Sequence, residues 1–104
     1  MSDRVLGPVG TKLLLENDRV RIWEMDLAPG ERSATHRHDH EYVLVQLEGD
    51  RIAAIPEPDT KGPYKKHTEG AVTPGKVVYI PSGGIETAVN TGERRYREIL
   101  IELK

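Results

Sequence analysis

The chain has 104 residues, which is enough for one domain with one hydrophobic core and too few for two. Its 15 Lys and Arg residues against 17 Asp and Glu residues give a formal net charge of -2, so no basic surface points to nucleic acid or an anionic membrane as partner. It has no cysteine, which excludes disulfides, thiolate metal ligands and a cysteine nucleophile. We therefore expect a single domain over residues 1–104 whose partners are small molecules or proteins.

Residues 1–10 contain two glycines and one proline and lack the apolar stretch of a signal peptide. We interpret them as a loose N-terminal leader that could pair at a sheet edge. No run in the sequence approaches the length needed to span a membrane. These features favour a cytoplasmic protein.

Short apolar segments separated by Pro, Gly, Asn and Asp turns run through the rest of the chain. Apolar residues do not recur at helical spacing over three turns, so the sequence predicts an all-β domain of about nine strands. The expected strands are 11–16, 20–27, 33–38, 42–47, 51–55, 64–68, 77–80, 85–90 and 96–103.

The expected strand over residues 20–27 is apolar on both faces. Trp23 and Met25 share one face, whereas Val20 and Ile22 lie on the other. We therefore expect both of its faces to be covered.

Three of the four histidines lie within five residues, at His36, His38 and His40. In an extended backbone these three side chains and Tyr42 point to the same face. Imidazoles that converge on the inner face of a sheet favour a divalent transition metal site. The alternative is a solvated strand end on which the mixed His, Arg and Asp residues only carry charge.

Two groups of residues resemble the two sequence motifs of the cupin family. The first motif, G-x5-H-x-H-x3-E-x6-G, matches at Gly30, His36, His38 and Gly49. The second, G-x5-P-x-G-x2-H-x3-N, matches at Gly75, Pro81, Gly83 and Asn90. The resemblance covers residues 30–90 and implies a double-stranded β-helix, the cupin jelly-roll barrel. We expect the four motif glycines to occupy turns with positive φ or close approach, and Asn90 to cap a turn.

The chain departs from the cupin pattern at two ligand positions. Tyr42 stands where the family has a glutamate, and Glu86 stands where it has a third histidine. His36, His38 and Glu86 remain as a two-histidine, one-carboxylate set that suits Fe(II), Mn(II), Ni(II) or Zn(II). Alternatively, the Glu86 carboxylate is solvated or pairs with an arginine, for which the candidates are Arg21, Arg37 and Arg97.

Other polar residues near the motifs are candidates for roles beside a metal. His40 could orient neighbouring groups from a second layer, and Tyr42 is better suited to donate a hydrogen bond to a bound oxygen than to ligate a metal. We assign these two residues as candidate catalytic groups. The lone His67 is expected at the surface.

Two function classes remain, with a structural or dimerisation module as a third, background interpretation. The first is a metal-dependent enzyme that acts on a small polar organic acid by oxygenation, isomerisation or hydration. The second is a non-catalytic cupin that binds a small ligand at a degenerate or metal-free site. The chain also resembles short cupins of β-alanine breakdown, which hints at small-acid catabolism, and the family resemblance implies a homodimer.

Overall fold

The structure is a computed structural model and describes residues 4–104. The part of the expected N-terminal leader in residues 1–3 lies outside the described residues. The described chain contains nine strands and no helix, which confirms the all-β prediction. The strands are β1 (Lys12–Glu16), β2 (Val20–Leu27), β3 (His36–Arg37), β4 (Tyr42–Glu48), β5 (Arg51–Pro56), β6 (Thr68–Ala71), β7 (Val77–Ile80), β8 (Ile85–Val89) and β9 (Tyr96–Leu103).

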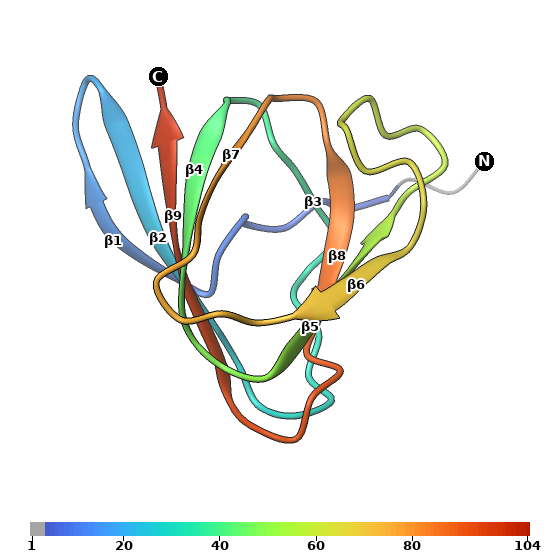
Figure 1. The fold of residues 1–104 in the computed structure, drawn as a ribbon. Coiled ribbons are helices and arrows are strands. Elements are labelled where there is room, and N and C mark those ends of the chain that lie inside the picture. Colours follow the sequence, from blue (N-terminus) through green and yellow to red (C-terminus); the bar gives the residue numbers. More distant parts are fainter. Residues whose placement is uncertain (1–3) are drawn as a thin grey trace.

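The strands form two antiparallel sheets that face each other (Figure 1). The larger sheet has the order β1-β2-β9-β4-β7, and the smaller has the order β3-β8-β5-β6. The longest strands, β2 and β9, pair over their full length in the larger sheet, from Val20 opposite Leu103 to Leu27 opposite Tyr96. Strands that are distant in the sequence therefore supply the walls of one interior.

Two of the expected strands differ in the structure. Of the segment 33–38, only His36 and Arg37 form a strand. The expected strand over 64–68 is wrong, because β6 begins at Thr68. The ladder between β5 and β6 ends where Ala54 pairs with Thr68, and two residues later β5 reaches Pro56, which has no N–H to extend it.

The core lies between the two sheets. Met25, Leu27 and Tyr96 are each at most 2% exposed, and burying such a side chain contributes about 1.5–3 kcal/mol. The complete buried cluster is Met25, Leu27, Tyr42, Ile80, Tyr96 and Leu100.

The larger sheet also has an apolar outer face. Val20 and Ile22 are half-buried there, so the second face of β2 is only partly covered within this chain. The cross-strand pairs Ile22 with Ile101, Val43 with Ile101 and Val45 with Ile99 continue the same surface. We call the set Val20, Ile22, Val43, Val45, Ile99 and Ile101 the outer apolar face.

The turn at Gly83 and Gly84 holds the segment after β3 against the start of β8. The Gly83 N–H donates to the His38 carbonyl at 2.8 Å, and the His38 N–H donates to the Gly84 carbonyl at 2.8 Å. Gly83 has φ of 105°, and a Cβ there would lie 3.1 Å from the Lys61 carbonyl oxygen, so both conformation and space require glycine.

All four motif glycines have positive φ, which confirms that expectation. Asn90 is fully buried, and its side-chain amide donates to the carbonyls of Leu27 and Arg94 while its oxygen accepts from the Gly92 N–H. Asn90 therefore caps the turn before β9, as expected from its place in the second motif.

The described part of the N-terminal segment contacts the body of the protein. The Gly7 N–H donates to the Thr35 carbonyl at 2.8 Å, and Arg4 pairs with Glu57 and Asp59. Val9 is buried. Within the described residues, no helix has the length and apolar character needed to cross a membrane.

Replacing Gly83 by alanine should destabilise the fold by about 2 kcal/mol or more, because an L side chain at this φ is strained and its Cβ crowds the Lys61 carbonyl. Urea unfolding would measure the change. Gly70→Ala is the matched control, since its Cβ would meet no heavy atom within 4 Å, and it should change stability by at most about 0.5 kcal/mol. Equal stability of the two variants would contradict the role of the Gly83 turn.

Candidate metal centre

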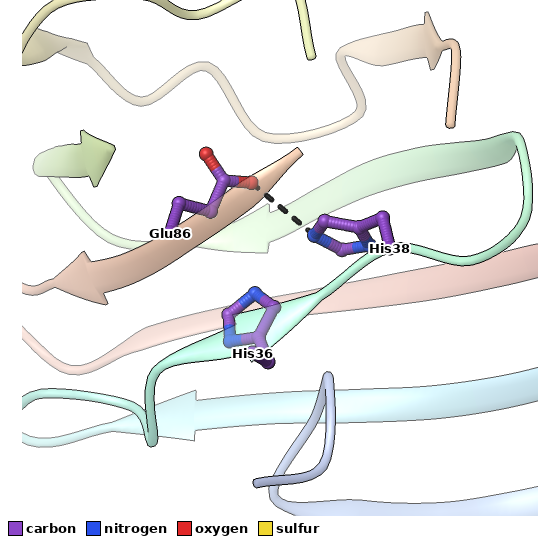
Figure 2. A group of neighbouring side chains, drawn as sticks. All are labelled: His36, His38 and Glu86. Carbon is purple, nitrogen blue, oxygen red and sulfur yellow. Dashed lines mark ion pairs between the residues drawn. The ribbon is translucent and has the colours of Figure 1, made fainter. Parts of the chain in front are cut away.

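His36, His38 and Glu86 lie together inside the barrel and point towards one another (Figure 2). Their exposed fractions are 3%, 2% and 8%, and one ligand atom from each lies within 4.8 Å of the others. The antiparallel pairing of β3 with β8 places His36 directly opposite Glu86. The predicted set of two imidazoles and one carboxylate therefore meets at one buried point.

Strand alternation explains which histidines reach this point. His36 and His38 are buried on either side of the exposed Arg37. The strand then ends, and His40 lies half-buried in a bend outside the residues that line the cavity. The inward parity resumes only at Tyr42, the first residue of β4.

The hydrogen bond of His36 fixes which of its ring nitrogens is free. Nδ1 lies 2.7 Å from the carbonyl oxygen of Ala34, which accepts hydrogen bonds only, so Nδ1 carries the proton. Nε2 of the neutral ring then has a free lone pair. Burial, and next the neighbouring His38, lower the pKa of His36, which keeps the ring neutral at pH 7. His36 is therefore prepared as a nitrogen ligand.

Glu86 forms an ion pair with His38 rather than with an arginine. The distance from His38 Nε2 to Glu86 Oε1 is 3.2 Å. The three arginines considered as partners bind other carboxylates: Arg21 pairs with Glu102, Arg37 with Asp39, and Arg97 with Glu24.

One atom of this cluster has no partner. Nδ1 of His38 is buried. Among the buried side-chain N and O atoms of the described residues, it is the one that lacks a hydrogen-bond partner. Leaving a buried polar atom unpaired costs about 1–3 kcal/mol, and such atoms concentrate where function retains them. The donor set of two imidazole nitrogens and one carboxylate oxygen fits Fe(II), Mn(II), Ni(II) or Zn(II).

Tyr42 lies against the centre as a neutral phenol. Its ring stacks on His38 with centroids 4.1 Å apart and planes 16° apart, and its side chain is 2% exposed. Burial, and next the charge of Glu86, raise the pKa of Tyr42 far above its usual value. Its O–H is therefore available as a donor, and the catalytic role expected from the sequence stays a prediction.

The three side chains open onto a cavity of about 150 Å³. Apolar side chains form most of its wall, and Glu98 adds a carboxyl group that our reading of the sequence did not identify. The residues that line the cavity are Met25, His36, His38, Tyr42, Leu44, Ile52, Ala53, Ala54, Tyr64, Thr68, Gly70, Ile80, Glu86, Ala88, Glu98 and Leu100.

The inward acids of β9 were missed because its sequence alternation is misleading. Ile99 and Ile101 form the apolar set that would be expected inside, yet they face outwards, and Glu98 and Glu102 are buried at 5% and 1% exposure. The signal that could have located them is pairing, since Glu102 lies opposite the buried Tyr42.

Glu102 is neutralised where it lies. Its Oε1 accepts from Arg21 Nε at 2.9 Å and from the Trp23 indole N–H at 2.5 Å. The charge of Glu102 also tends to raise the pKa of His36, against the larger lowering by burial. Arg21 and Trp23 are thus occupied by structural contacts.

His67 lies away from the centre, as expected for a surface residue. Its side chain is 55% exposed, and its Nε2 lies 3.1 Å from Glu69 Oε1. It contributes nothing to the cavity wall.

Comparison with solved structures identifies the fold. A cupin domain from Bordetella pertussis Tohama I has a TM-score of 0.75, at 22% sequence identity, over 99% of each chain. The barrel is therefore a cupin double-stranded β-helix, which confirms the resemblance inferred from the two motifs.

Sequence comparison narrows the class to a family. The family model described as auxin binding protein matches residues 8–103, and the chain belongs to this family. Auxin-binding protein T85 from Nicotiana tabacum is 30% identical over 83 residues, which cover 79% of this chain and 44% of that protein. The chain thus spans less than half the length of this relative.

A second relative matches a shorter part of this chain. The β-alanine degradation protein BauB from Pseudomonas aeruginosa is 38% identical over 50 residues, which cover 47% of this chain and 53% of that protein.

Replacing Arg21 by methionine should destabilise the protein by about 2–4 kcal/mol, because it leaves the buried Glu102 carboxylate without its cation. Chemical denaturation would measure this loss. Arg37→Met is the control, since the exposed pair of Arg37 with Asp39 should contribute at most about 1 kcal/mol. A similar cost for both variants would show that Glu102 does not need Arg21.

Proposed function

We propose that this protein is a metal-dependent cupin enzyme that acts on a small polar organic acid by oxygenation, isomerisation or hydration. The observation that carries the proposal is the convergence of His36, His38 and Glu86 at a buried point where no arginine of residues 4–104 pairs with the carboxylate. A buried carboxylate is costly unless it is paired, and its one ionic partner among the described residues is a histidine. A divalent cation would balance the acid and use both imidazoles.

The ligand atoms follow from the hydrogen bonds. His36 would bind through Nε2, since Nδ1 is held by Ala34, and His38 and Glu86 would bind through the atoms that now face each other. A bound divalent cation supplies Lewis-acid polarisation of a substrate oxygen. Tyr42 donates its phenol hydrogen to the substrate from beside the centre, and its stacking on His38 fixes the ring. The half-buried His40 is proposed to orient this edge of the site.

The substrate class follows from the size and chemistry of the cavity. A volume of about 150 Å³ admits a molecule of only a few carbon atoms. The apolar wall suits its carbon chain, and the few polar groups suit its oxygen atoms. The name of BauB, which concerns degradation of the small acid β-alanine, supports the same class.

The alternative function is a non-catalytic cupin that binds a small ligand without turnover. The family name, which refers to binding of auxin, and the mostly apolar cavity favour it.

Conversion of a small organic acid by the metal-loaded protein would distinguish the enzyme from a binding protein. That activity should be lost in Tyr42→Phe with the metal retained, because only the O–H donor is removed.

The purified protein should bind one divalent ion of Fe, Mn, Ni or Zn per chain and should unfold at a higher temperature when the ion is present. Glu86→Gln should weaken the binding by more than about 100-fold, since removing a direct ligand exceeds the 10–100-fold typical of outer groups. Metal analysis and calorimetric titration would measure both effects.

His67→Ala is the control for this experiment, because His67 is exposed and distant from the centre. It should leave metal affinity unchanged, whereas His36→Ala with His38→Ala should abolish it. Absence of a bound ion, together with an unchanged unfolding temperature in all four metals, would refute the metal-dependent function.

We propose further that two copies of the chain associate through the outer apolar face. Half-buried Val and Ile side chains continue across three adjacent strands there, an extended apolar surface of the kind that marks interfaces. A second copy offers the same apolar set about a two-fold axis. The expected cytoplasmic location stays a prediction.

The wild-type protein should therefore elute as a dimer in size-exclusion chromatography with light scattering. Ile22→Lys should shift it to monomer, because it places a charge at the centre of the outer apolar face. Val5→Lys is the control, since Val5 is 89% exposed and lies outside that face. A monomeric wild type would exclude this assembly.

A further inference from the structure

Glu98 places a second polar point in the cavity, on a different layer from the candidate metal centre. On β9 it lies opposite Gln46 of β4, whereas Glu102 lies opposite Tyr42. The Glu98 carboxyl group nevertheless lies near enough to the centre for the charge of Glu86 to raise its pKa, and both groups line the same cavity. Leu44 and Leu100, which pair between the two layers, supply the apolar wall. On β9 and β4 an apolar pair thus separates the level of Glu98 from that of Tyr42.

The Glu98 carboxyl group is buried without a cationic partner in the described part of the chain. Among the described residues it forms no ion pair with Lys, Arg or His, and its hydrogen-bond partner is the Tyr96 hydroxyl. Burial raises the pKa of Glu98 to about 7. The neutral acid is therefore well populated near neutral pH, whereas an ordinary glutamate is ionised.

The groups that face Glu98 add no positive charge. Tyr96 lies on its own strand, Tyr42 on β4, Glu86 on β8 and Tyr64 in the loop before β6. The neighbour on β2 is Met25, which does not titrate.

A chain of hydrogen bonds fixes where the proton of neutral Glu98 lies. The Thr73 N–H donates to Gln46 Oε1 at 3.1 Å, which leaves the Gln46 amide group to donate to the Tyr96 hydroxyl oxygen. Tyr96 O–H in turn donates to Glu98 Oε1. Because Oε1 accepts, the acid proton belongs on Oε2, which has no protein partner among the described residues. Glu98 therefore offers an O–H donor to the cavity.

We propose that Glu98 is the second binding point for the ligand and receives a carbonyl or hydroxyl oxygen at the far end of a short-chain acid. The carboxylate of that acid lies at the end with His36, His38 and Glu86, so this part rests on the proposed function. The ligand class is thus a short oxo or hydroxy acid with an apolar spacer.

The size of the cavity limits the length of this acid. A cavity of about 150 Å³ is large enough for benzene, so the ligand has about six to eight heavy atoms. An ammonium group at the far end would require ionised Glu98 in an apolar wall, which burial disfavours. The geometry therefore selects an oxygen acceptor over an amine.

Three probes of matched size test this inference: 4-oxopentanoate, pentanoate and 4-aminopentanoate. In calorimetric titrations at pH 6, with the protein both metal-free and zinc-loaded, the wild type should bind 4-oxopentanoate about tenfold more tightly than the other two, as one added hydrogen bond predicts. Equal affinities, failure of all three to bind, or preference for the amine would overturn the inference.

Two variants assign the preference to Glu98. Glu98→Gln should retain it, because the amide oxygen can accept from Tyr96 while its NH₂ group donates to the ligand. Glu98→Met should abolish it, since methionine fills similar space and has no donor. If Glu98→Met fails to fold, the retained preference of Glu98→Gln and the order of the three probes on the wild type decide the matter. A preference that persists in folded Glu98→Met would overturn the inference.

The metal readout separates this inference from the proposed function. Both variants should bind zinc as the wild type does, because Glu98 is not a ligand of the centre. If the wild type binds no metal and still selects 4-oxopentanoate, the proposed function fails and the role of Glu98 stands. If metal binds and the three probes are equal, the role of Glu98 fails and the metal centre stands.

Discussion

The site depends on one short contact, the antiparallel pairing of β3 with β8. Only two residue pairs form it, yet it sets His36 opposite Glu86 and brings groups fifty residues apart in the chain to one point. The Gly83 turn secures the pairing by two backbone hydrogen bonds to His38. A shift of one residue would turn the imidazoles or the acid to the wrong face, because strand side chains alternate. The register of β3 with β8 is therefore the constraint on which the candidate metal centre depends.

The interior of the barrel contains three buried carboxyl groups. Glu86, Glu98 and Glu102 are all buried, and each is accommodated differently. Glu102 has an arginine and an indole N–H, Glu86 has an imidazole, and Glu98 has a phenol hydroxyl and a raised pKa. Burial penalises a charge wherever no cation balances it. These different partners therefore explain why Glu102 has a structural role, why Glu86 suits a metal and why Glu98 suits a neutral hydrogen-bond donor.

Side chains alternate along β9, so its isoleucines face outwards and its glutamates face inwards. Ile99 and Ile101 lie on the outer apolar face, which is only half-buried in one chain, so this surface fits association of two copies. The inner face is then free to carry the polar groups of the cavity. In a barrel this small the wall of the core is also the wall of the cavity, and the proposed dimer would bury the outer apolar face.

The sequence by itself determined the strand content, the glycine turns and the identity of His36, His38 and Glu86, because turn chemistry, alternation and motif spacing are local properties of the chain. It predicted a strand over residues 64–68, whereas β6 begins only at Thr68. It also placed His40 on the same face as His36 and His38, whereas His40 lies in a bend after the strand has ended. It also did not indicate that Glu98 and Glu102 are buried. Only the tertiary structure decided which face of β9 is inside and how the cavity is lined, because these depend on pairing between strands that are distant in sequence, and local patterns do not encode that register.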